Sequence, residues 1–494
     1  MTTLEPLSPP VLSCAAAREL EARLFERDEA RELAAMEAAG AAIASAVLRD
    51  FEEIGGFPRD GRVLVLAGKG HNGGDALIAA RVILERLAGA TVSVHFAFGT
   101  KQLRPLAARA WRELAHKGRG RVTQVRDIGD VPWSLILDGV FGFQFRPPAD
   151  AEVVSLFRKV NAAAARVRAA IDLPSAGIFR ADFTYATGSV KEPLLGNEAA
   201  GRIRYLDLGF FAEPSSSVDV PDRVLTSALL DPLRRLRSSA SDKRSFGNVF
   251  LIGGSRGFPG AILMAAMAAV RSGAGLVTVF VPESLAPAYA ARLPEAMWVG
   301  WPETPAGSLA LEGEHLLRER LERADAIVMG PGMGRESETR ALARSVMESS
   351  AIPVIVDADA LQPEIVNAGH APRIVTPHAG EFARISGGME LREFAANPNL
   401  MVVLKGAATR LSAGGPVFHS FFGGPVLARG GSGDLLAGMI GAQVAQSPGQ
   451  PFLATARAVV WHGVAADLLA RAHGQVAVRT TQLLDFLAAA LRAP

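Results

Sequence analysis

The chain has 494 residues, of which 49% are hydrophobic and 21% charged, so it holds enough apolar material for more than one core. Its 52 basic and 50 acidic residues nearly cancel, a balance that predicts neither a nucleic-acid-binding nor a membrane-binding surface. Cys14 is the single cysteine, which excludes an intramolecular disulfide and a Cys-x-x-Cys metal site. We find no targeting segment and no membrane-spanning stretch, and we therefore expect a cytoplasmic protein.

The N-terminal half begins with helical sequence and continues as alternating strands and helices. Residues 18–54 are rich in Ala and Glu at helical spacing and predict one or two helices. A buried strand at 62–67 leads into a glycine loop at 68–75, which is followed by a helix at 76–87 and a strand at 91–96. This order is typical of the nucleotide-binding edge of a parallel α/β sheet. Asp75 in the loop either caps the helix or contributes a carboxylate to a ligand site.

Two later strands of this half end in acidic residues. One strand ends at Asp138, and another ends at Asp172 and continues into a turn that contains Ser175. Because the carboxyl ends of parallel strands share one edge of the sheet, we expect these residues near Asn72 of the glycine loop. A single Asp at such a place is often only a cap or a turn former. Together, the four side chains can supply hard oxygen ligands for a monovalent cation, or acid–base groups.

These motifs resemble the NAD(P)H-hydrate epimerase domain over roughly residues 15–225, with its Asn-Asn-Gly-Gly-Asp loop, a strand ending in Asp-x-x-Phe-Gly and an Asp-x-Pro-Ser-Gly turn; Lys191 belongs to the resemblance. The resemblance implies that Asn72, Asp138 and Ser175 hold K⁺ and that Asp172 is the catalytic acid–base. It implies that the hydrated dinucleotide contacts His71, Asn72, Gly73, Gly74, Asp75, Gly142, Phe143, Gln144, Phe145, Arg146, Pro147, Pro148 and Asp172. The chain departs from the family pattern at His71, Ala76 and Ala176.

A change in composition separates the two halves. Residues 211–222 contain Pro and Ser without an apolar period and predict a surface connection. The apolar residues of 223–240 predict a short helix that packs between domains. We therefore expect one domain at 1–225, a linker at 226–240 and a second domain at 241–494.

The C-terminal half contains five apolar runs that end in small, polar or charged residues, as expected where parallel strands meet a ligand. The runs are 250–252, 327–329, 354–356, 374–375 and 402–404, and they end in Gly253–Ser255, Gly330–Gly334, Asp357–Asp359, Thr376–Glu381 and Lys405–Thr409. A glycine-rich turn at 428–434 then enters a helix with one apolar face. The first turn of that helix offers unpaired N–H groups and a positive dipole end, which together can hold a phosphate. Asp434 in this turn is either a helix cap or a base that activates a hydroxyl beside the phosphate.

These strand ends resemble the ribokinase-like fold, and more narrowly the ADP- or ATP-dependent NAD(P)H-hydrate dehydratases, over roughly residues 240–490. The resemblance implies that Asp434 is the catalytic base and that ADP or ATP, with Mg²⁺, donates the phosphoryl group. It implies a nucleotide site made of Lys405, Gly406, Ala407, Ala408, Thr409, Gly430, Gly431, Ser432 and Gly433. It implies a substrate site made of Ala261, Gly332, Gly334, His378 and Asp434, although His378 alone can also be an ordinary loop histidine. The family's His-Lys-Gly is Asp242-Lys243-Arg244 here.

The sequence thus predicts an α/β protein with an N-terminal Rossmann-like three-layer α/β/α domain and a C-terminal ribokinase-like domain. The resemblance implies a bifunctional, homo-oligomeric enzyme that epimerises the R and S hydrates of NADH and NADPH. It also implies dehydration of the S epimer, releasing phosphate and AMP or ADP, with no nucleic-acid or membrane partner. One alternative is a ribokinase-like kinase of a small alcohol or sugar. In another alternative, the N-terminal half is a dinucleotide- or partner-binding module that has lost catalysis, and the replacement of the family's Asn by His71 would reflect that loss.

Overall fold

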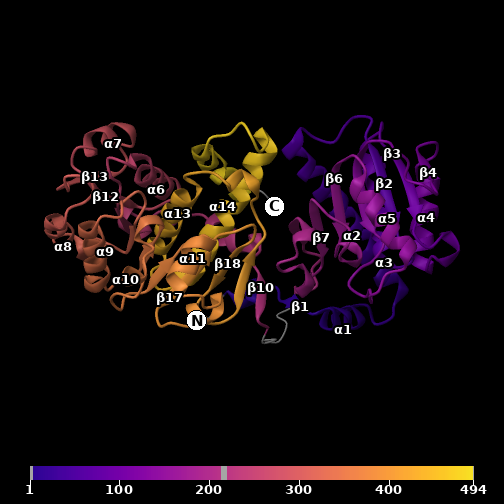
Figure 1. The fold of residues 1–494 in the computed structure, drawn as a ribbon, viewed down its shortest axis with the longest axis horizontal. Coiled ribbons are helices and arrows are strands. Elements are labelled where there is room, and N and C mark those ends of the chain that lie inside the picture. Colours follow the sequence, from indigo (N-terminus) through magenta and orange to yellow (C-terminus); the bar gives the residue numbers. More distant parts are fainter. Residues whose placement is uncertain (1–3, 213–219, 493–494) are drawn as a thin grey trace. The chain divides into compact units, whose positions relative to one another are not determined.

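The protein, as a computed structural model that describes residues 4–212 and 220–492, forms two compact units. The N-terminal unit consists of Pro9–Val220 and Ala470–Gln475, and the C-terminal unit of Met1–Ser8, Pro221–Leu469 and Val476–Pro494. Each unit contains a sheet that is wholly or mostly parallel, together with helices (Figure 1), so the predicted α/β fold class is confirmed. Of the predicted surface connection at 211–222, residues 213–219 lie outside the described residues.

The N-terminal unit is built on a seven-stranded sheet in which every neighbouring pair is parallel. The strand order is β4-β3-β2-β5-β6-β7-β9, which reverses direction between β2 and β5. In such sheets the ligand binds beyond the carboxyl ends of the strands at the reversal. The strands are β2 (Arg62–Ala67), β3 (Thr91–Phe96), β4 (Val122–Gln124), β5 (Trp133–Gly139), β6 (Ala165–Ile171), β7 (Phe183–Thr187) and β9 (Arg202–Leu206), and β1 (Val11–Leu12) pairs separately with β8 (Val190–Lys191).

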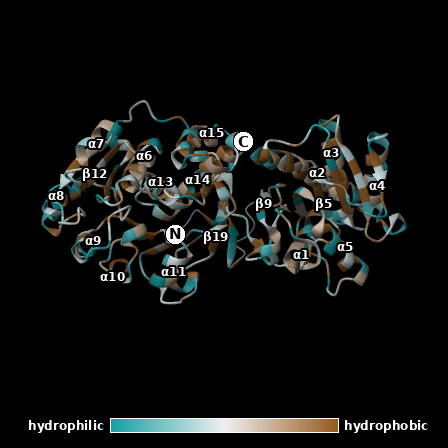
Figure 2. Cartoon of the chain, turned by 45° about the horizontal axis from the view of Figure 1, so that its top comes forward, coloured by the Kyte–Doolittle hydropathy of each residue, from teal (hydrophilic) through white to brown (hydrophobic). Residues whose placement is uncertain are grey.

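Helices cover both faces of this sheet and give three layers. Val63 and Val65 share a core with α2, α3 and α4, whereas Leu64 and Leu66 share another with α5. Strands buried on both faces read as continuous apolar runs, and β5 is largely hydrophobic in Figure 2. The helices are α1 (Cys14–Phe25), α2 (Glu29–Phe51), α3 (His71–Arg86), α4 (Pro105–Lys117) and α5 (Ala151–Ala162).

Helix α3 begins five residues earlier than the sequence predicts, at His71 instead of Ala76. The helix continues through Gly73 and Gly74, where a side chain would meet its neighbours too closely. A Cβ on Gly73 would lie 2.3 Å from the Gly68 carbonyl oxygen, and one on Gly74 would lie 2.1 Å from Met36 Cε. The predicted glycine loop is therefore largely the first turn of a helix.

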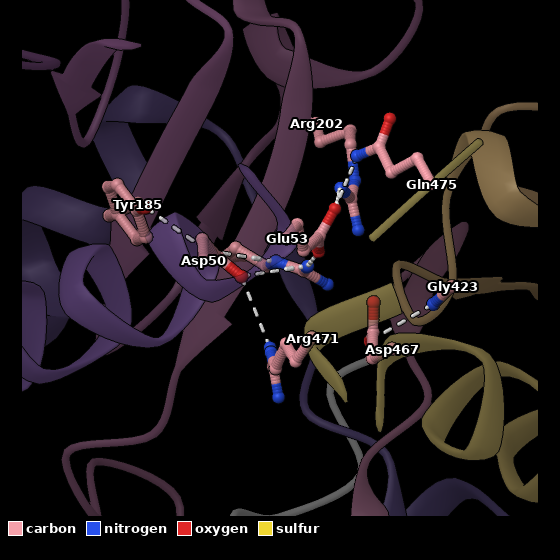
Figure 3. Close-up of polar contacts among 9 residues, drawn as sticks. Asp50, Glu53, Tyr185, Arg202, Gly423, Asp467, Arg471 and Gln475 are labelled. Atoms are coloured by element: carbon pink, nitrogen blue, oxygen red, sulfur yellow. Dashed lines mark hydrogen bonds and ion pairs between the residues drawn. The ribbon is translucent and has the colours of Figure 1, made fainter. Parts of the chain in front are cut away.

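In the N-terminal unit a cluster of polar side chains joins the C-terminal end of α2 to strands β7 and β9 (Figure 3). The Tyr185 hydroxyl of β7 donates to Asp50 Oδ2 of α2 at 3.1 Å. Arg202 Nη1 of β9 donates to Glu53 Oε2 at 2.6 Å. Both carboxylates are buried, and an arginine compensates the charge of each, Arg204 for Asp50 and Arg202 for Glu53, which offsets the cost of desolvating them.

The C-terminal unit is built on a ten-stranded sheet with the order β10-β19-β18-β17-β16-β15-β14-β11-β12-β13. All neighbours are parallel except β18, which is antiparallel to β17 and β19. The order reverses between β11 and β14. The strands are β10 (Asp222–Val224), β11 (Asn248–Ile252), β12 (Leu276–Pro282), β13 (Met297–Trp301), β14 (Ala326–Met329), β15 (Val354–Val356), β16 (Arg373–Val375), β17 (Leu400–Leu404), β18 (Thr409–Ser412) and β19 (Val417–Ser420).

Helix α13 (Ser432–Gln446) packs closely on this sheet and on α6 (Pro259–Arg271). A Cβ on Gly441 would lie 2.3 Å from Val328 Cγ2 of β14. The opposite sheet face packs against α9 (Ser337–Ser349), α10 (Pro363–Val366), α11 (Ala379–Ser386) and α12 (Leu391–Ala395). The other helices are α7 (Ala286–Arg292), α8 (Glu314–Arg318), α14 (Pro451–His473) and α15 (Leu487–Arg492).

Among the described residues, α14 is long and apolar enough to cross a membrane by length and composition alone. Within the structure, 78% of its most apolar window is buried, as in the core helix of a folded domain.

The short helix predicted at 223–240 is only partly correct. Asp222–Val224 form the edge strand β10, which pairs with β19 and is fixed by Asp222 Oδ1 and His419 Nε2 at 2.7 Å. Residues Ser227–Arg234 form a 3₁₀ helix that contains Pro232. Proline has no N–H to donate, which disfavours an α-helix here.

Candidate functional sites

A cavity of about 310 Å³ opens in the N-terminal unit near the ends of β2 and β5. It brings together eight of the predicted residues, namely His71, Asn72, Asp75, Gly142, Phe143, Gln144, Phe145 and Asp172. Gly73 and Gly74 are buried in the first turn of α3, and Arg146, Pro147 and Pro148 are exposed and do not line the cavity. The cavity therefore coincides with most, but not all, of the predicted substrate site.

Asp172 is held rigidly at the cavity wall. Its backbone has φ of 65°, in the left-handed region, which Asp tolerates better than most residues. Lys191 Nζ binds Asp172 Oδ1, and the Phe143 N–H donates to Oδ2 at 3.2 Å. Both charged side chains are almost fully buried. The ammonium thus compensates the charge of a carboxylate whose position is defined by two contacts.

Two further carboxyls in the cavity have unusual surroundings. Asp75 Oδ1 is buried without a hydrogen-bond partner among the described residues, and burial raises its pKa well above the usual range. The first residue of α3 is preceded by Gly70, and no side chain caps the helix, so Asp75 is not a cap. Burial also raises the pKa of Glu21 on α1 to about 7, with Lys191 opposing the shift and Asp172 adding to it. Glu21 was not predicted from the sequence.

The three predicted K⁺ ligands lie around the backbone N–H and carbonyl of Phe141. Asn72 Nδ2 donates to the Phe141 carbonyl at 2.8 Å, and the Phe141 N–H donates to Ser175 Oγ at 2.9 Å. Ser175 Oγ in turn donates to Asp138 Oδ1 at 2.7 Å. Asp138 is fully buried, and its pKa is raised to about 6 by burial, against hydrogen bonds from Ser175 and Val140.

The residues present at this cluster fit a monovalent cation. The donors are amide, carboxylate, hydroxyl and carbonyl oxygens, the ligands that hard cations prefer. Among the described residues no Lys or Arg pairs with Asp138, so a bound cation would compensate this buried charge. No group of three or more His, Cys, Asp or Glu side chains in the described parts of the chain is suited to a transition metal.

His71 begins α3 at the rim of the cavity. Its Nε2 lies 3.5 Å from Glu32 Oε2, and its side chain is 43% exposed. The imidazole is thus directed at a carboxylate of α2 and remains accessible to a ligand.

In the C-terminal unit the ends of four parallel strands are joined by hydrogen bonds and ion pairs. Asp357, after β15, accepts from Thr376 Oγ1 at 2.6 Å and from Lys405 Nζ at 3.0 Å. The Gly334 N–H, after β14, donates to Asp359 Oδ2 at 3.1 Å. The predicted convergence of these strand ends on one place is confirmed.

Asp434 lies in the first turn of α13 and is half-buried. No side chain caps α13, whose N-cap is Gly431 with φ of 92°, so the cap interpretation of Asp434 is excluded. The pKa of Asp434 is raised to about 6 by burial and by the nearby Asp357 and Asp359, while Lys405 lowers it. A carboxyl group with a pKa closer to neutral pH suits a general base. Its place beside N–H groups that no side chain caps suits a phosphate site.

The remaining predicted nucleotide residues flank this turn. A Cβ on Gly433 would lie 3.0 Å from Lys405 Nζ, which places the ammonium beside the start of α13. Burial lowers the pKa of Lys405, but Asp357 and other carboxylates outweigh burial, so it is raised overall. Ser432 Oγ donates to the Leu427 carbonyl at 2.7 Å and Thr480 Oγ1 to the Gly430 carbonyl at 2.8 Å, which fixes the turn. Gly406, Ala407 and Ala408 connect β17 to β18, and Thr409 is the first residue of β18.

His378 has a structural task. Its Nδ1 accepts from the N–H groups of Gly380 at 3.0 Å and Glu381 at 3.2 Å, and it thereby caps α11. This capping role is what the interpretation of His378 as an ordinary loop histidine predicts for Nδ1. The side chain is 63% exposed, so a ligand can still reach it. Ala261 and Gly332 lie together at the reversal between β11 and β14, since a Cβ on Gly332 would be 3.1 Å from Ala261 Cβ.

Asp357 was predicted from the sequence only as a strand end, without a role in the site. Its signal was present, because it directly follows an apolar run that aligns with its neighbours. Glu21 carried no such signal, since it is one of many acidic residues in a helical stretch.

Each of the two α/β units gathers polar side chains at the carboxyl ends of its parallel strands, an arrangement typical of enzymes that bind small molecules. The family described as NAD(P)H-hydrate dehydratase matches residues 249–488, and the family described as YjeF-related protein N-terminus matches residues 32–192.

Relatives extend this likeness over most of the chain. The Bifunctional NAD(P)H-hydrate repair enzyme Nnr of Moorella thermoacetica is 33% identical, over 92% of this chain and 92% of that protein. The protein of the same name from Gloeobacter violaceus is 36% identical, over 97% and 98%. The solved structure of ADP/ATP-dependent NAD(P)H-hydrate dehydratase from Bacillus subtilis, co-crystallised with ATP/Mg²⁺, is 30% identical with a TM-score of 0.47, over 53% of this chain and 96% of that one. The chain belongs to the family of bifunctional NAD(P)H-hydrate repair enzymes.

Proposed function

We propose that the C-terminal unit restores NAD(P)H from its S hydrate with ADP or ATP, and that the N-terminal unit interconverts the R and S hydrates. The observation that supports the first activity most directly is Asp434. Its pKa is raised to about 6, and it lies in the first turn of α13, which no side chain caps. The second activity rests on the cavity that holds Asp172 and Lys191. Family membership is the common support for both.

The proposed dehydration runs through a phosphate ester. Hydroxide is a poor leaving group at neutral pH, so the hydroxyl is first phosphorylated. Asp434 takes the proton of the C6 hydroxyl while the hydroxyl oxygen bonds to the terminal phosphorus of the nucleotide. The bond between that phosphorus and the bridging oxygen breaks, and AMP leaves from ADP, or ADP from ATP. Loss of phosphate from C6 and of a proton from C5 then restores the C5=C6 double bond. The N–H groups of the turn at 430–433 and the Lys405 ammonium stabilise the charge of the transferring phosphoryl group, and Mg²⁺ accompanies the nucleotide.

In the proposed epimerisation site Asp172 acts as an acid–base group on the hydrate. Asn72, Asp138 and Ser175 hold K⁺, which supplies positive charge next to the buried Asp138 carboxylate. The predictions of a homo-oligomer and of a cytoplasmic location remain predictions from the sequence.

The test uses the full chain, a mixture of R and S hydrates of NADH, and ADP or ATP. We expect the absorbance of reduced nicotinamide to return until both epimers are consumed, with release of free phosphate. A halt once the S epimer is exhausted would contradict epimerisation. A stable phosphate ester without recovery of NADH would contradict dehydration and favour the kinase alternative.

A further inference from the structure

Inversion at one carbon requires proton transfer on both faces of the ring. On the first face the C6–O bond breaks while the N1 lone pair forms an N1=C6 double bond, and the departing hydroxide takes a proton and leaves as water. On the other face a water oxygen bonds to C6, its proton passes to a base, and the electron pair returns to N1. Each inversion therefore uses one acid and one base.

Asp172 is suited to be the base. Its charge is compensated by Lys191 and its position is defined by the Phe143 N–H. These contacts hold its two oxygens at the cavity wall, where one of them can accept a proton from a water molecule that enters the site.

Glu21 is a carboxyl of the same cavity in different surroundings. It lies on α1, whereas Asp172 follows β6, so the two groups reach the cavity from different elements. Among the described residues no side chain forms a hydrogen bond or ion pair with Glu21, which leaves its carboxyl to a ligand. Burial raises its pKa to about 7, Asp172 and Glu32 add to this shift, and Lys191 opposes it.

The other carboxyls of the cavity are less suited to the same task. Asp75 is buried within α3, and burial together with the charges of Asp172 and Glu21 raises its pKa well above the usual range. Glu32 lies 3.5 Å from His71 Nε2 and belongs to that pair.

We propose that Glu21 and Asp172 are a two-carboxyl acid–base pair that acts on opposite faces of C6 of the bound hydrate, with Glu21 protonating the departing hydroxyl and Asp172 taking a proton from the entering water. Two carboxyls in different surroundings, one of which gives a proton while the other takes one, are a recurrent solution to this task. After one inversion Glu21 is ionised and Asp172 is protonated, which is the arrangement that the reverse reaction needs; exchange with solvent restores the first state. This inference rests on the proposed epimerase function of the N-terminal unit.

The test follows formation of the R hydrate of NADH from the purified S hydrate by the full chain without nucleotide, so that no dehydration occurs. We expect Glu21→Gln to lower kcat by at least ~100-fold with KM little changed, and Glu21→Asp to retain part of the activity. Glu19→Gln is the matched control, since Glu19 lies exposed on the same helix and does not line the cavity. Dehydration with ADP stays normal in all three variants.

Two further readouts separate catalysis from a structural role. In the wild type the inversion rate depends on a group with a pKa near 7, and Glu21→Gln removes this dependence. In H₂¹⁸O each inversion incorporates one solvent oxygen at C6. Retention of the original oxygen, or normal inversion by Glu21→Gln, overturns the inference while leaving the epimerase function intact. If the wild type itself does not exceed spontaneous inversion, both fail.

Discussion

At the scale of single residues, Asp434 determines the pH dependence that we expect for dehydration. Its pKa of about 6 means that the carboxylate, the form that accepts a proton, is lost as the pH falls below 6. We expect kcat/KM to fall about tenfold per pH unit below that point. Asp434→Asn removes this fall of kcat/KM at acidic pH and lowers the rate by at least ~100-fold, while nucleotide binding persists. Measuring phosphate release from pH 5 to 8 checks this, and near-normal turnover of the variant would refute the assignment.

Asp138 allows a test of the proposed cation at the same scale. A ligand present at 100 times its Kd stabilises a folded protein by about 2.7 kcal/mol, so K⁺ should raise the Tm of the N-terminal unit relative to a large organic cation. Asp138→Asn should abolish this difference. Asp127→Asn, at an exposed carboxylate that pairs with Lys159, should leave it unchanged. Equal Tm values of the wild type in both salts would contradict the K⁺ site.

At the scale of elements, the first turn of α13 is positioned by close contact between α13 and α6. A Cβ on Gly438 would lie 2.0 Å from the Ala265 carbonyl oxygen, which belongs to backbone and cannot move aside cheaply. We expect Gly438→Ala to cost about 1–3 kcal/mol and to lower dehydration, because the helix that carries Asp434 must shift. Thermal unfolding and phosphate release are the two measurements.

Gly260→Ala on α6 is the control for this substitution. A Cβ there meets nothing within 4 Å, so alanine should stabilise the unit by about 0.4–1 kcal/mol through a less flexible unfolded chain. Equal stability of the two variants would show that the contact between α13 and α6 is not as close as described.

At the scale of the whole molecule, the C-terminal unit includes β10, which begins before the predicted linker. A fragment that starts at Pro221 keeps this edge strand, and we expect it to fold and to dehydrate the S hydrate. A fragment that starts at Leu230 loses β10 and leaves the edge of β19 unpaired, so we expect lower Tm and more aggregation. Unfolding curves and light scattering of both fragments check this, and identical behaviour would mean that β10 is dispensable.

The sequence by itself determined the central strands of both sheets, their polar ends and the glycine-rich turn that enters α13. Apolar runs bounded by Gly, Asp or Lys are local signals, and parallel strands necessarily bring such ends to one edge. Tertiary structure decided what depends on distant contacts. Helix α3 begins at His71, where Gly73 lies close to the backbone of Gly68, and residues 222–224 are a strand because β19 pairs with them. Glu21 joins Asp172 only because a helix and a strand end, far apart in sequence, line the same cavity. Spacing along the chain does not contain that information.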